Sequence, residues 1–324
     1  MPLFLHGPLR PAKLVLITLV ITILLSSPWL LAPKQWIHTK GLRLAFATLL
    51  LESNVNSTAT DSDVYFNSVR ILSYQLQHDK STCTRHSIPF LVLTTPGVLP
   101  WKREQLSREG AIIVQVQKVD SSWASPGHER WHDVMAKLRV FELTDYDRVA
   151  FMDADTFLLK SLDGIFEDPA AQPKKTQHKS EVRPDEEQLP DQYVFATSAE
   201  VTHTTHVYPP IPMSYFNAGL FVLGPSAELF RYYTSLFKVA DRFDTTYPEQ
   251  NLLNYAHRQH GNMPWSRIFY GWNIQLPNMN DVKRGVASVH AKLWTAGNDL
   301  QPVPQELQDL WQKKKTEMER YYKA

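Results

Sequence analysis

Cysteine is nearly absent from this sequence, in which Cys83 is the one cysteine among 324 residues. A single thiol excludes both a framework of intramolecular disulfides and a zinc site built from cysteines. Any metal must therefore be held by oxygen and imidazole ligands. An excess of charge of one sign is also lacking, because 34 basic residues stand against 33 acidic ones. This balance gives no general electrostatic reason to bind nucleic acid, and we expect no nucleic-acid partner.

Long hydrophobic runs are rare, and the clearest one lies near the amino terminus. Residues 14–32 read LVLITLVITILLSSPWLLA, with Arg10 and Lys13 before them and Lys34 after them. At about 1.5 Å per residue, a helix of this length rises roughly 28 Å, close to the thickness of a bilayer core. The sequence therefore predicts a transmembrane signal anchor at 14–32. The preceding basic residues predict that residues 1–13 are a short cytosolic tail.

Two alternatives remain open for this segment. The dense apolar part, Leu14–Leu25, has the length of a signal peptide, and the Ser-Ser-Pro that follows could precede a cleavage site. The segment could also be a buried helix of the folded protein. With an anchor, residues 33–41 form a stem and the rest of the chain is lumenal or extracellular. The glycosylation sequon at Asn56 agrees with that side.

Residues 42–324 are predicted to form one α/β domain. Apolar runs typical of buried strands alternate with stretches of helical periodicity. Strands are expected at 42–51, 88–94, 111–116, 148–152, 193–197 and 215–223. Helices are expected at 63–77, near Trp101, and at 130–143, 227–237 and 305–322. This alternation predicts a largely parallel sheet covered on both faces, with ligands beyond the carboxyl ends of its strands.

One stretch departs from this alternation. Residues 169–191 contain four prolines and many charges. Such a composition is typical of an exposed or partly disordered insertion.

Candidate metal ligands follow two apolar runs. Asp153 and Asp155 come directly after the strand predicted at 148–152. Residues two apart on an extended strand share a face, so both carboxylates can converge on one divalent cation, which could neutralise a phosphate. His290 ends another apolar run, and imidazole with carboxylate oxygens suits manganese better than calcium. Each candidate ligand also has an interpretation without a metal. The two aspartates could form a polar turn or cap a helix, and His290 could be a hydrogen-bonded histidine of the core.

Several blocks follow one another in a fixed order. Residues 136–166 read AKLRVFELTDYDRVAFMDADTFLLKSLDGIF, Tyr215–Pro225 read YFNAGLFVLGP, and Glu249–Asn254 read EQNLLN. Leu276-Pro-Asn-Met-Asn280 and His290 come after them. In sequence and order these blocks resemble the glycogenin-like branch of family 8 glycosyltransferases. The likeness extends over most of residues 42–295.

The resemblance implies a GT-A fold, which is Rossmann-like, and metal-dependent transfer from a UDP-sugar with retention at the anomeric carbon. It implies Mn²⁺, or Mg²⁺, held by Asp153, Asp155 and His290. The activity expected is that of a hexosyl- or N-acetylhexosaminyltransferase. The donor-binding residues that it implies are Lys137, Asp153, Ala154, Asp155, Asn217, Ala218, Gly219, Glu249, Gln250, His290 and Lys292. The catalytic residues that it implies are Asp153, Asp155, Glu249 and Gln250.

Three departures from the family pattern matter. Glu249 stands where the family usually has aspartate, so the carboxylate reaches one methylene further. The spacing from His290 to Lys292 is compressed, which leaves Lys292 as a candidate phosphate contact only. Glycogenin is cytosolic, whereas this chain opens with an apparent anchor. The expected protein is therefore a single-pass type II enzyme of the Golgi membrane with a lumenal catalytic domain, unless cleavage leads to secretion.

The partners expected for such an enzyme are a nucleotide-sugar donor, a glycan or glycoprotein acceptor, the membrane and a second copy of the chain as a homodimer.

Two other functions stay open. A haloacid-dehalogenase-like phosphatase would use Asp153 as its nucleophile, although its pattern wants threonine or valine where Phe157 stands. A catalytically inactive, membrane-tethered sugar-binding protein is the other, and the intact trio of candidate ligands argues against it.

Overall fold

The computed structural model describes residues 41–52, 63–120 and 133–323. The predicted anchor at 14–32, the tail before it, nearly all of the predicted stem and the sequon at Asn56 lie outside the described residues. None of the helices in the described ranges combines the length and the hydropathy that a membrane span requires.

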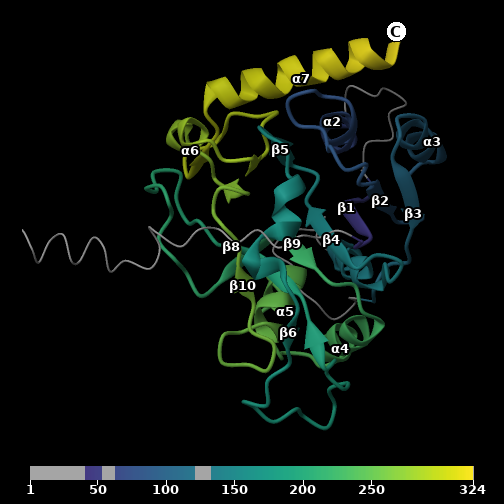
Figure 1. Ribbon diagram of the computed structural model, residues 1–324, viewed down its shortest axis with the longest axis vertical. Helices are drawn as coiled ribbons and strands as arrows, with labels where there is room; N and C mark the ends of the chain where they lie inside the picture. The colour runs from purple at the N-terminus through teal and green to yellow at the C-terminus, as the bar shows by residue number, and fades with distance from the viewer. Residues whose placement is uncertain (1–40, 53–62, 121–132, 324) are drawn as a thin grey trace, which may run out of the picture. The chain divides into compact units, whose positions relative to one another are not determined.

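A mixed, mostly parallel sheet forms the centre of the described fold (Figure 1). Within the described chain its seven strands lie in the order β10-β8-β9-β4-β1-β2-β3. Neighbouring strands are parallel, except that β9 runs antiparallel to both β8 and β4. The prediction of an α/β fold with a largely parallel sheet is confirmed. The strands are β1 (Leu44–Leu50), β2 (Phe90–Thr94), β3 (Ile112–Gln115), β4 (Arg148–Met152), β8 (Phe195–Ala199), β9 (Phe216–Leu223) and β10 (Ser266–Arg267).

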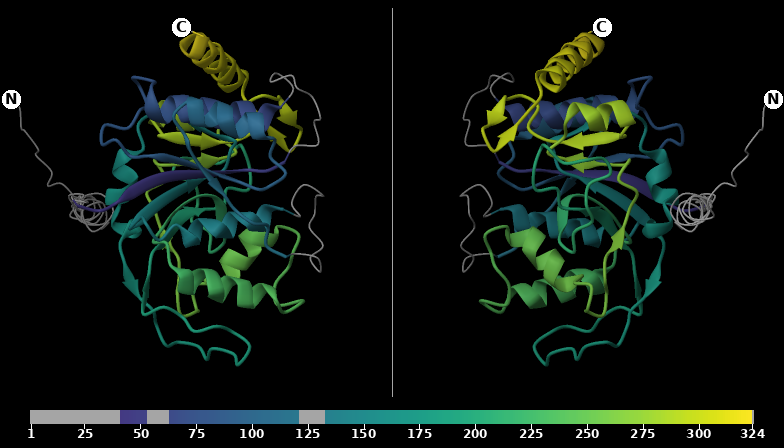
Figure 2. Two further views of the ribbon diagram at one scale, coloured as in Figure 1. Left: turned by 90° about the vertical axis from the view of Figure 1, so that its right-hand side faces the viewer. Right: turned by 90° about the vertical axis from the view of Figure 1, so that its left-hand side faces the viewer.

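Helices cover both faces of this sheet because its strands are apolar on both sides. Successive side chains of a strand point to opposite faces. On β1, Phe46 and Leu50 join an apolar cluster with residues of α2 (Val64–Gln77). Ala47 and Leu49 join the opposite cluster, which contains residues of α4 (Ala227–Phe237) and α5 (Pro248–Ala256). Figure 2 shows α2 on one side of the sheet and the green helices α4 and α5 on the other.

The helix predicted at 130–143 differs from its prediction. Its described part is a 3₁₀-helix, η3 (Val134–Glu142), and not an α-helix. Met135, Leu138 and Phe141 are fully buried in the cluster shared with α4 and α5. Packing against several neighbours therefore fixes this segment more strongly than its local helical periodicity does.

A second, smaller sheet lies beside the end of β4. It consists of β11 (Ile274–Gln275), β12 (Ser288–His290) and β5 (Thr156–Leu158), in that order. The antiparallel register of β5 and β12 places His290 opposite Thr156, one residue beyond Asp155. Residues of α7 (Gln305–Lys323) pack on this sheet. The small sheet thus brings His290 to the aspartates.

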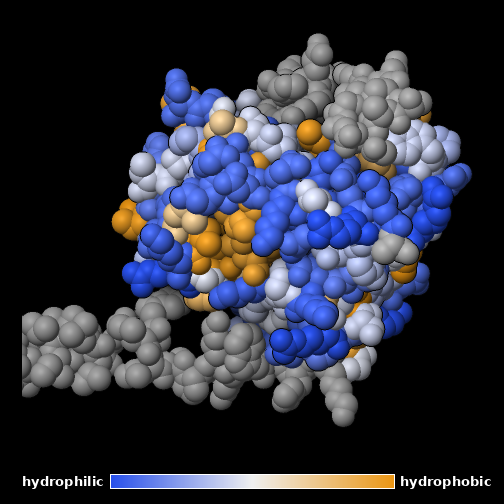
Figure 3. Space-filling model, turned by 90° about the horizontal axis from the view of Figure 1, so that it is seen from above, coloured by the Kyte–Doolittle hydropathy of each residue, from blue (hydrophilic) through white to orange (hydrophobic). Residues whose placement is uncertain are grey.

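Shorter elements complete the described chain. They are α3 (Pro100–Arg108), η4 (Asp163–Glu167), η5 (Pro169–Ala171), β6 (Lys174–Lys175), β7 (Gln192–Tyr193), α6 (Met279–Arg284), β13 (Gly297–Asn298) and β14 (Gln301–Pro302). Seen from the side of α7, the surface is mostly hydrophilic, with apolar side chains gathered in one orange area (Figure 3).

The segment predicted as an insertion, 169–191, is mostly exposed but is held at several points. The side chain of Asn262 accepts hydrogen bonds from the backbone of Lys179 and Ser180, both at 2.9 Å. Arg242 forms ion pairs with Asp185 and Glu186. These contacts fasten the charged segment to the helical layer beside α4.

Candidate active site

Strand ends of both sheets surround one cavity of about 460 Å³. Asp153 and Asp155 follow β4, Glu200 follows β8, and Asn217 lies near the start of β9. This is the edge at which open α/β sheets bind ligands. Its other lining residues are Tyr247, Glu249, Gln250, Gln275, Leu276, Pro277, His290, Ala291, Lys292, Thr295, Gly297, Asn298, Gln301, Pro302 and Val303.

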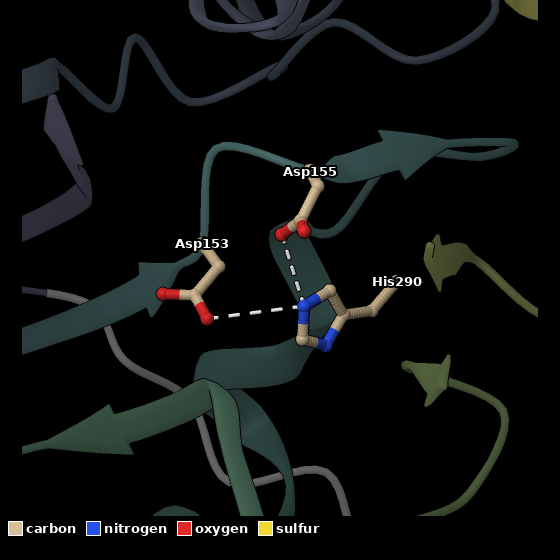
Figure 4. A group of neighbouring side chains, drawn as sticks. All are labelled: Asp153, Asp155 and His290. Carbon is tan, nitrogen blue, oxygen red and sulfur yellow. Dashed lines mark ion pairs between the residues drawn. The ribbon is translucent and has the colours of Figure 1, made fainter. Parts of the chain in front are cut away.

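Asp153, Asp155 and His290 form a compact group in this cavity (Figure 4). One ligand atom from each lies within 4.8 Å of the others. The Nε2 atom of His290 is 3.0 Å from Oδ1 of Asp155 and 3.8 Å from Oδ2 of Asp153. Two carboxylates and an imidazole are a donor set that suits Mn²⁺ or Mg²⁺, and the arrangement agrees with the predicted ligands.

The backbone at Gly219 makes room for the histidine ring. A Cβ atom at Gly219 would lie 2.0 Å from Cε1 and 2.3 Å from Nδ1 of His290, which is closer than real contacts allow. The carbonyl oxygen of Gly219 also accepts a hydrogen bond of 2.7 Å from the backbone N–H of Asp153. Only glycine at this position allows β9 and His290 to approach each other so closely.

The charges of the trio depend on one another. Burial alone would raise the pKa of Asp155, but the adjacent His290 ring lowers it to about 2. Burial likewise opposes protonation of His290, yet Asp155 and Asp153 raise the pKa of the ring. Burial raises the pKa of Asp153 despite the attraction of Lys137 and His290. Two carboxylates and the Nε2 atom of His290 therefore form a polar site that favours a cation over an apolar ligand.

Lys137 lies beneath the cavity and does not line it. Its side chain is 3% exposed, and Nζ is 2.8 Å from Oδ1 of Asp153 and 2.8 Å from Oε1 of Glu249. It also donates to the carbonyl oxygen of Ala218 at 3.3 Å. Burial lowers the pKa of Lys137, but the two carboxylates outweigh it and the net shift is upward. Lys137 therefore ties a metal-ligand candidate to a residue of α5.

Polar side chains of α5 hold the start of β9. Oε1 of Gln250 accepts a hydrogen bond of 2.9 Å from the backbone N–H of Ala218. One helical turn later, Asn254 accepts from the N–H of Phe216 at 3.0 Å and donates to its carbonyl at 2.9 Å. Residues four apart share a helix face, so this pair bonds the start of β9, where pairing with β4 has not yet begun. Asn217 is thereby held at the cavity.

The sequence analysis missed Glu200, which lines the cavity. Gln250 donates to Glu200 over 3.5 Å and to the hydroxyl of Tyr215 over 2.9 Å. Burial raises the pKa of Glu200, and its hydrogen bond with Asn217 acts in the opposite direction. An acidic residue directly after an apolar strand is the same signal that identified Asp153. That signal could have identified Glu200 as well.

The remaining predicted residues divide into two groups. Lys292 lines the cavity, together with Asn217, Glu249 and Gln250. Ala154 and Ala218 are buried and are not among the lining side chains. Their contact with a donor, like that of Lys137, stays a prediction. The β13–β14 hairpin lines the cavity without having been predicted to do so.

Comparisons by sequence find distant relatives. No protein-family model matches the chain. An uncharacterized protein of Schizosaccharomyces pombe is 28% identical over 285 residues, which cover 78% of this chain and 74% of that protein. Galactinol synthase 1 of Solanum lycopersicum is 26% identical over 180 residues, which cover 51% of this chain and 49% of that enzyme. The similarity to the enzyme therefore extends over about half of each chain.

Comparisons by structure find glycosyltransferases. The galactosyltransferase LgtC, solved with donor and acceptor sugar analogs, has a TM-score of 0.51 at 15% identity, with 83% of this chain and 95% of LgtC covered. The apo form of the glycosyltransferase GlyE of Streptococcus pneumoniae TIGR4 has a TM-score of 0.50 at 11% identity, with 87% and 63% covered. The chain therefore shares the fold of these glycosyltransferases, and the predicted GT-A architecture fits it.

Proposed function

We propose that this protein is a metal-dependent, glycogenin-like glycosyltransferase that transfers a sugar from a UDP-sugar to a hydroxyl of an acceptor. The observation that carries the proposal is the convergence of Asp153, Asp155 and His290 in a cavity of about 460 Å³, on a glycosyltransferase fold. A nucleotide sugar needs both a cation for its diphosphate and polar groups for its sugar hydroxyls. The cavity offers candidates for both at one strand edge.

The cation would be held by Asp153, Asp155 and His290, and it would neutralise the charge of the departing diphosphate. Lys292 lines the same cavity and would add a positive charge on the diphosphate side. Asn217 and Glu200, on the side of β8 and β9, would hydrogen-bond hydroxyl groups of the sugar. Lys137 keeps Asp153 and Glu249 in fixed positions before a ligand arrives, which limits reorganisation during the reaction.

Retention at the anomeric carbon is part of the proposal. A double displacement needs a nucleophile that is free to attack the sugar. Glu249 is paired with Lys137 at 2.8 Å, and Oε1 of Gln250 accepts from Ala218 at 2.9 Å. Glu200, the other carboxylate on this side of the cavity, is hydrogen-bonded to Asn217 and Gln250. All three side chains are already engaged, which favours a front-face substitution. The anomeric configuration of the product, measured by NMR, tests this assignment.

The first experiment is a donor screen on the full-length chain in detergent. UDP release is followed for a panel of UDP-sugars with Mn²⁺ and again with a chelator. We expect release from one sugar and its loss with chelator. Asp155→Asn is expected to abolish metal-dependent UDP binding. Asp145→Asn, an exposed aspartate before the amino end of β4, is the matched control and should leave binding unchanged.

Two results would contradict the proposal, and a third would change its set of metal ligands. Absence of both UDP binding and UDP release in the wild-type chain would remove the transferase assignment. Magnesium-dependent hydrolysis of a phosphate ester would favour the phosphatase instead. Unchanged Mn²⁺-dependent affinity in Asp155→Asn would remove Asp155 from the metal ligands.

The cellular setting rests on the sequence. We propose a single-pass type II protein of the Golgi membrane with a lumenal catalytic domain, supported by the apolar run at 14–32 and the basic residues before it. Carbonate extraction should leave the chain in the membrane, and protease added to intact vesicles should spare residues after the anchor. Release by carbonate together with digestion of the whole chain would contradict this topology.

A further inference from the structure

A continuous apolar run lies between β8 and β9, where most of its residues are exposed, although Tyr208 is half-buried and Pro210 is buried. Residues 207–213 read VYPPIPM, and we refer to them as the apolar loop. Its side chains at Val207, Ile211 and Met213 are 63%, 73% and 41% exposed. Single exposed apolar side chains are ordinary, whereas several in one short segment mark a contact surface. The apolar loop therefore needs a partner that core packing does not provide.

The apolar loop is held in place on both sides. Before it, Nε2 of His206 lies 3.1 Å from both carboxylate oxygens of Asp281 on α6. At its end, Arg267 of β10 donates to the carbonyl of Met213 at 2.8 Å. Three of its seven residues are prolines, which fix φ and restrict the backbone further. The side chains are thus presented in a fixed arrangement and need little ordering on binding.

Basic residues flank the apolar loop. The segment between Glu200 and Tyr215 contains no aspartate or glutamate. Arg267, which contacts Met213, is exposed, as are Lys283 and Arg284 of α6. Arg284 also acts electrostatically on Tyr208 of the loop. Apolar side chains beside basic ones are typical of surfaces that lie in the interface of a bilayer, where the basic side chains can reach headgroup phosphates.

The apolar loop is also close to the cavity along the chain. Glu200 precedes its segment and lines the cavity, and Asn217, which also lines it, follows four residues after Met213. Residues 33–43 between the predicted anchor and β1 can span at most about 40 Å when fully extended. An anchored chain would therefore hold the start of β1 within about 40 Å of its own membrane.

We propose that the apolar loop inserts into the membrane surface, so that the cavity faces acceptor hydroxyl groups carried by membrane lipids. The proposal rests on the proposed transferase for the identity of the acceptor. The membrane contact itself rests on the exposed apolar run, its rigid attachment and its basic surroundings. The two parts can be tested separately.

The test uses the single cysteine of the chain. In the full-length protein, Cys83→Ser removes the natural thiol, and Ile211→Cys provides one site for an environment-sensitive nitrobenzoxadiazole label. The protein is reconstituted in phosphatidylcholine vesicles with or without nitroxide-labelled lipid. We expect a blue shift and at least threefold stronger quenching than for a label at Ile112. Ile112 is 48% exposed on β3, the far edge strand of the sheet.

Further measurements show which part fails. Met213→Glu should weaken quenching at position 211, because a charge in the membrane interface is unfavourable. Far-UV circular dichroism and a cooperative urea transition of the same labelled proteins report that they are folded, and Mn²⁺-dependent UDP binding separately reports the proposed transferase site. Equal quenching at positions 211 and 112 in a folded chain would overturn the membrane contact. Strong quenching at 211 without UDP binding by any variant would support the contact and contradict the transferase function.

Discussion

The cavity and the apolar loop both depart from the usual rule that charged side chains are exposed and apolar side chains are buried. At the cavity, charged groups are buried, with Lys137 only 3% exposed. In the apolar loop, hydrophobic groups are exposed, with Ile211 at 73%. Both arrangements are unfavourable for folding alone, because burying charge requires desolvation and exposing apolar surface forgoes burial. Each therefore indicates a ligand, and the two ligands differ in kind.

The difference lies in how each region is stabilised. Lys137 is held by Asp153, Glu249 and the carbonyl of Ala218, so the cavity is stabilised by its own charges. The apolar loop is stabilised from outside, by the His206–Asp281 pair and by Arg267. Changes in the cavity should thus affect both stability and ligand binding. Changes at the exposed tips of the loop should leave stability and ligand binding in the cavity unchanged, and should weaken only the proposed membrane contact.

Lys137→Met gives the largest expected effect on stability. Removal of the cation leaves Asp153 and Glu249 close together without compensation, and breaking a buried pair typically destabilises by about 3–5 kcal/mol. Saturating Mn²⁺ should reduce the loss, because a cation at Asp153 restores a positive charge. Urea unfolding with and without Mn²⁺ measures both effects.

The matched control for this change is Lys238→Met, an exposed lysine directly after α4. It should shift the unfolding midpoint little. A Lys137→Met chain as stable as the control would mean that the buried charges do not stabilise the cavity.

Gly219→Ala should weaken Mn²⁺ binding by about 100-fold or more, equivalent to roughly 2.7 kcal/mol. The added Cβ would lie 2.0 Å from Cε1 of His290 and would displace the ring. Gly224→Ala is the control, since its Cβ would meet Val194 at an ordinary 3.4 Å. Titration calorimetry with Mn²⁺ compares them. Equal affinity in both variants would show that His290 does not contribute to binding.

Much of the cavity was predictable because its signals are local. Asp153 and Asp155 follow an apolar run, which indicates the carboxyl end of a strand. His290 ends another apolar run, which indicates the end of a second strand. The β5–β12 register that joins them depends on tertiary pairing, which spacing alone does not specify. The ion pair between Lys137 and Glu249 spans 112 positions and could not be derived from either neighbourhood.

Other features gave a misleading local signal. The helical periodicity of 134–142 predicts an α-helix, but packing against several elements leads to a 3₁₀-helix. The apolar run 207–213 was not assigned to any strand or helix from sequence, and its Val207 and Ile211 are exposed. Its three prolines argue against a central strand, because they cannot donate to a sheet ladder. Exposure depends on the surroundings of a segment, which its composition does not contain.

Mn²⁺ affinity should fall at acidic pH. The imidazole of His290 must be neutral to bind a cation, so each pH unit below its pKa lowers affinity about tenfold. Asp155 and Asp153 raise that pKa despite burial, so the loss should begin above the ordinary value of about 6.5. Burial raises the pKa of Asp153, which acts in the same direction. Affinity that stays constant from pH 8 to pH 5 would contradict this coupling.

The smallest effect is expected at the tip of the apolar loop. Ile211→Ser should change the free energy of unfolding by less than about 0.5 kcal/mol, because the side chain is already exposed. Tyr208→Ala is the internal comparison. Because Tyr208 packs against a buried cluster, this substitution should lower the free energy of unfolding by on the order of 1–2 kcal/mol. Urea unfolding of both variants in detergent measures the difference. A larger loss for Ile211→Ser than for Tyr208→Ala would place Ile211 in the core, and the contrast between the two regions would fail.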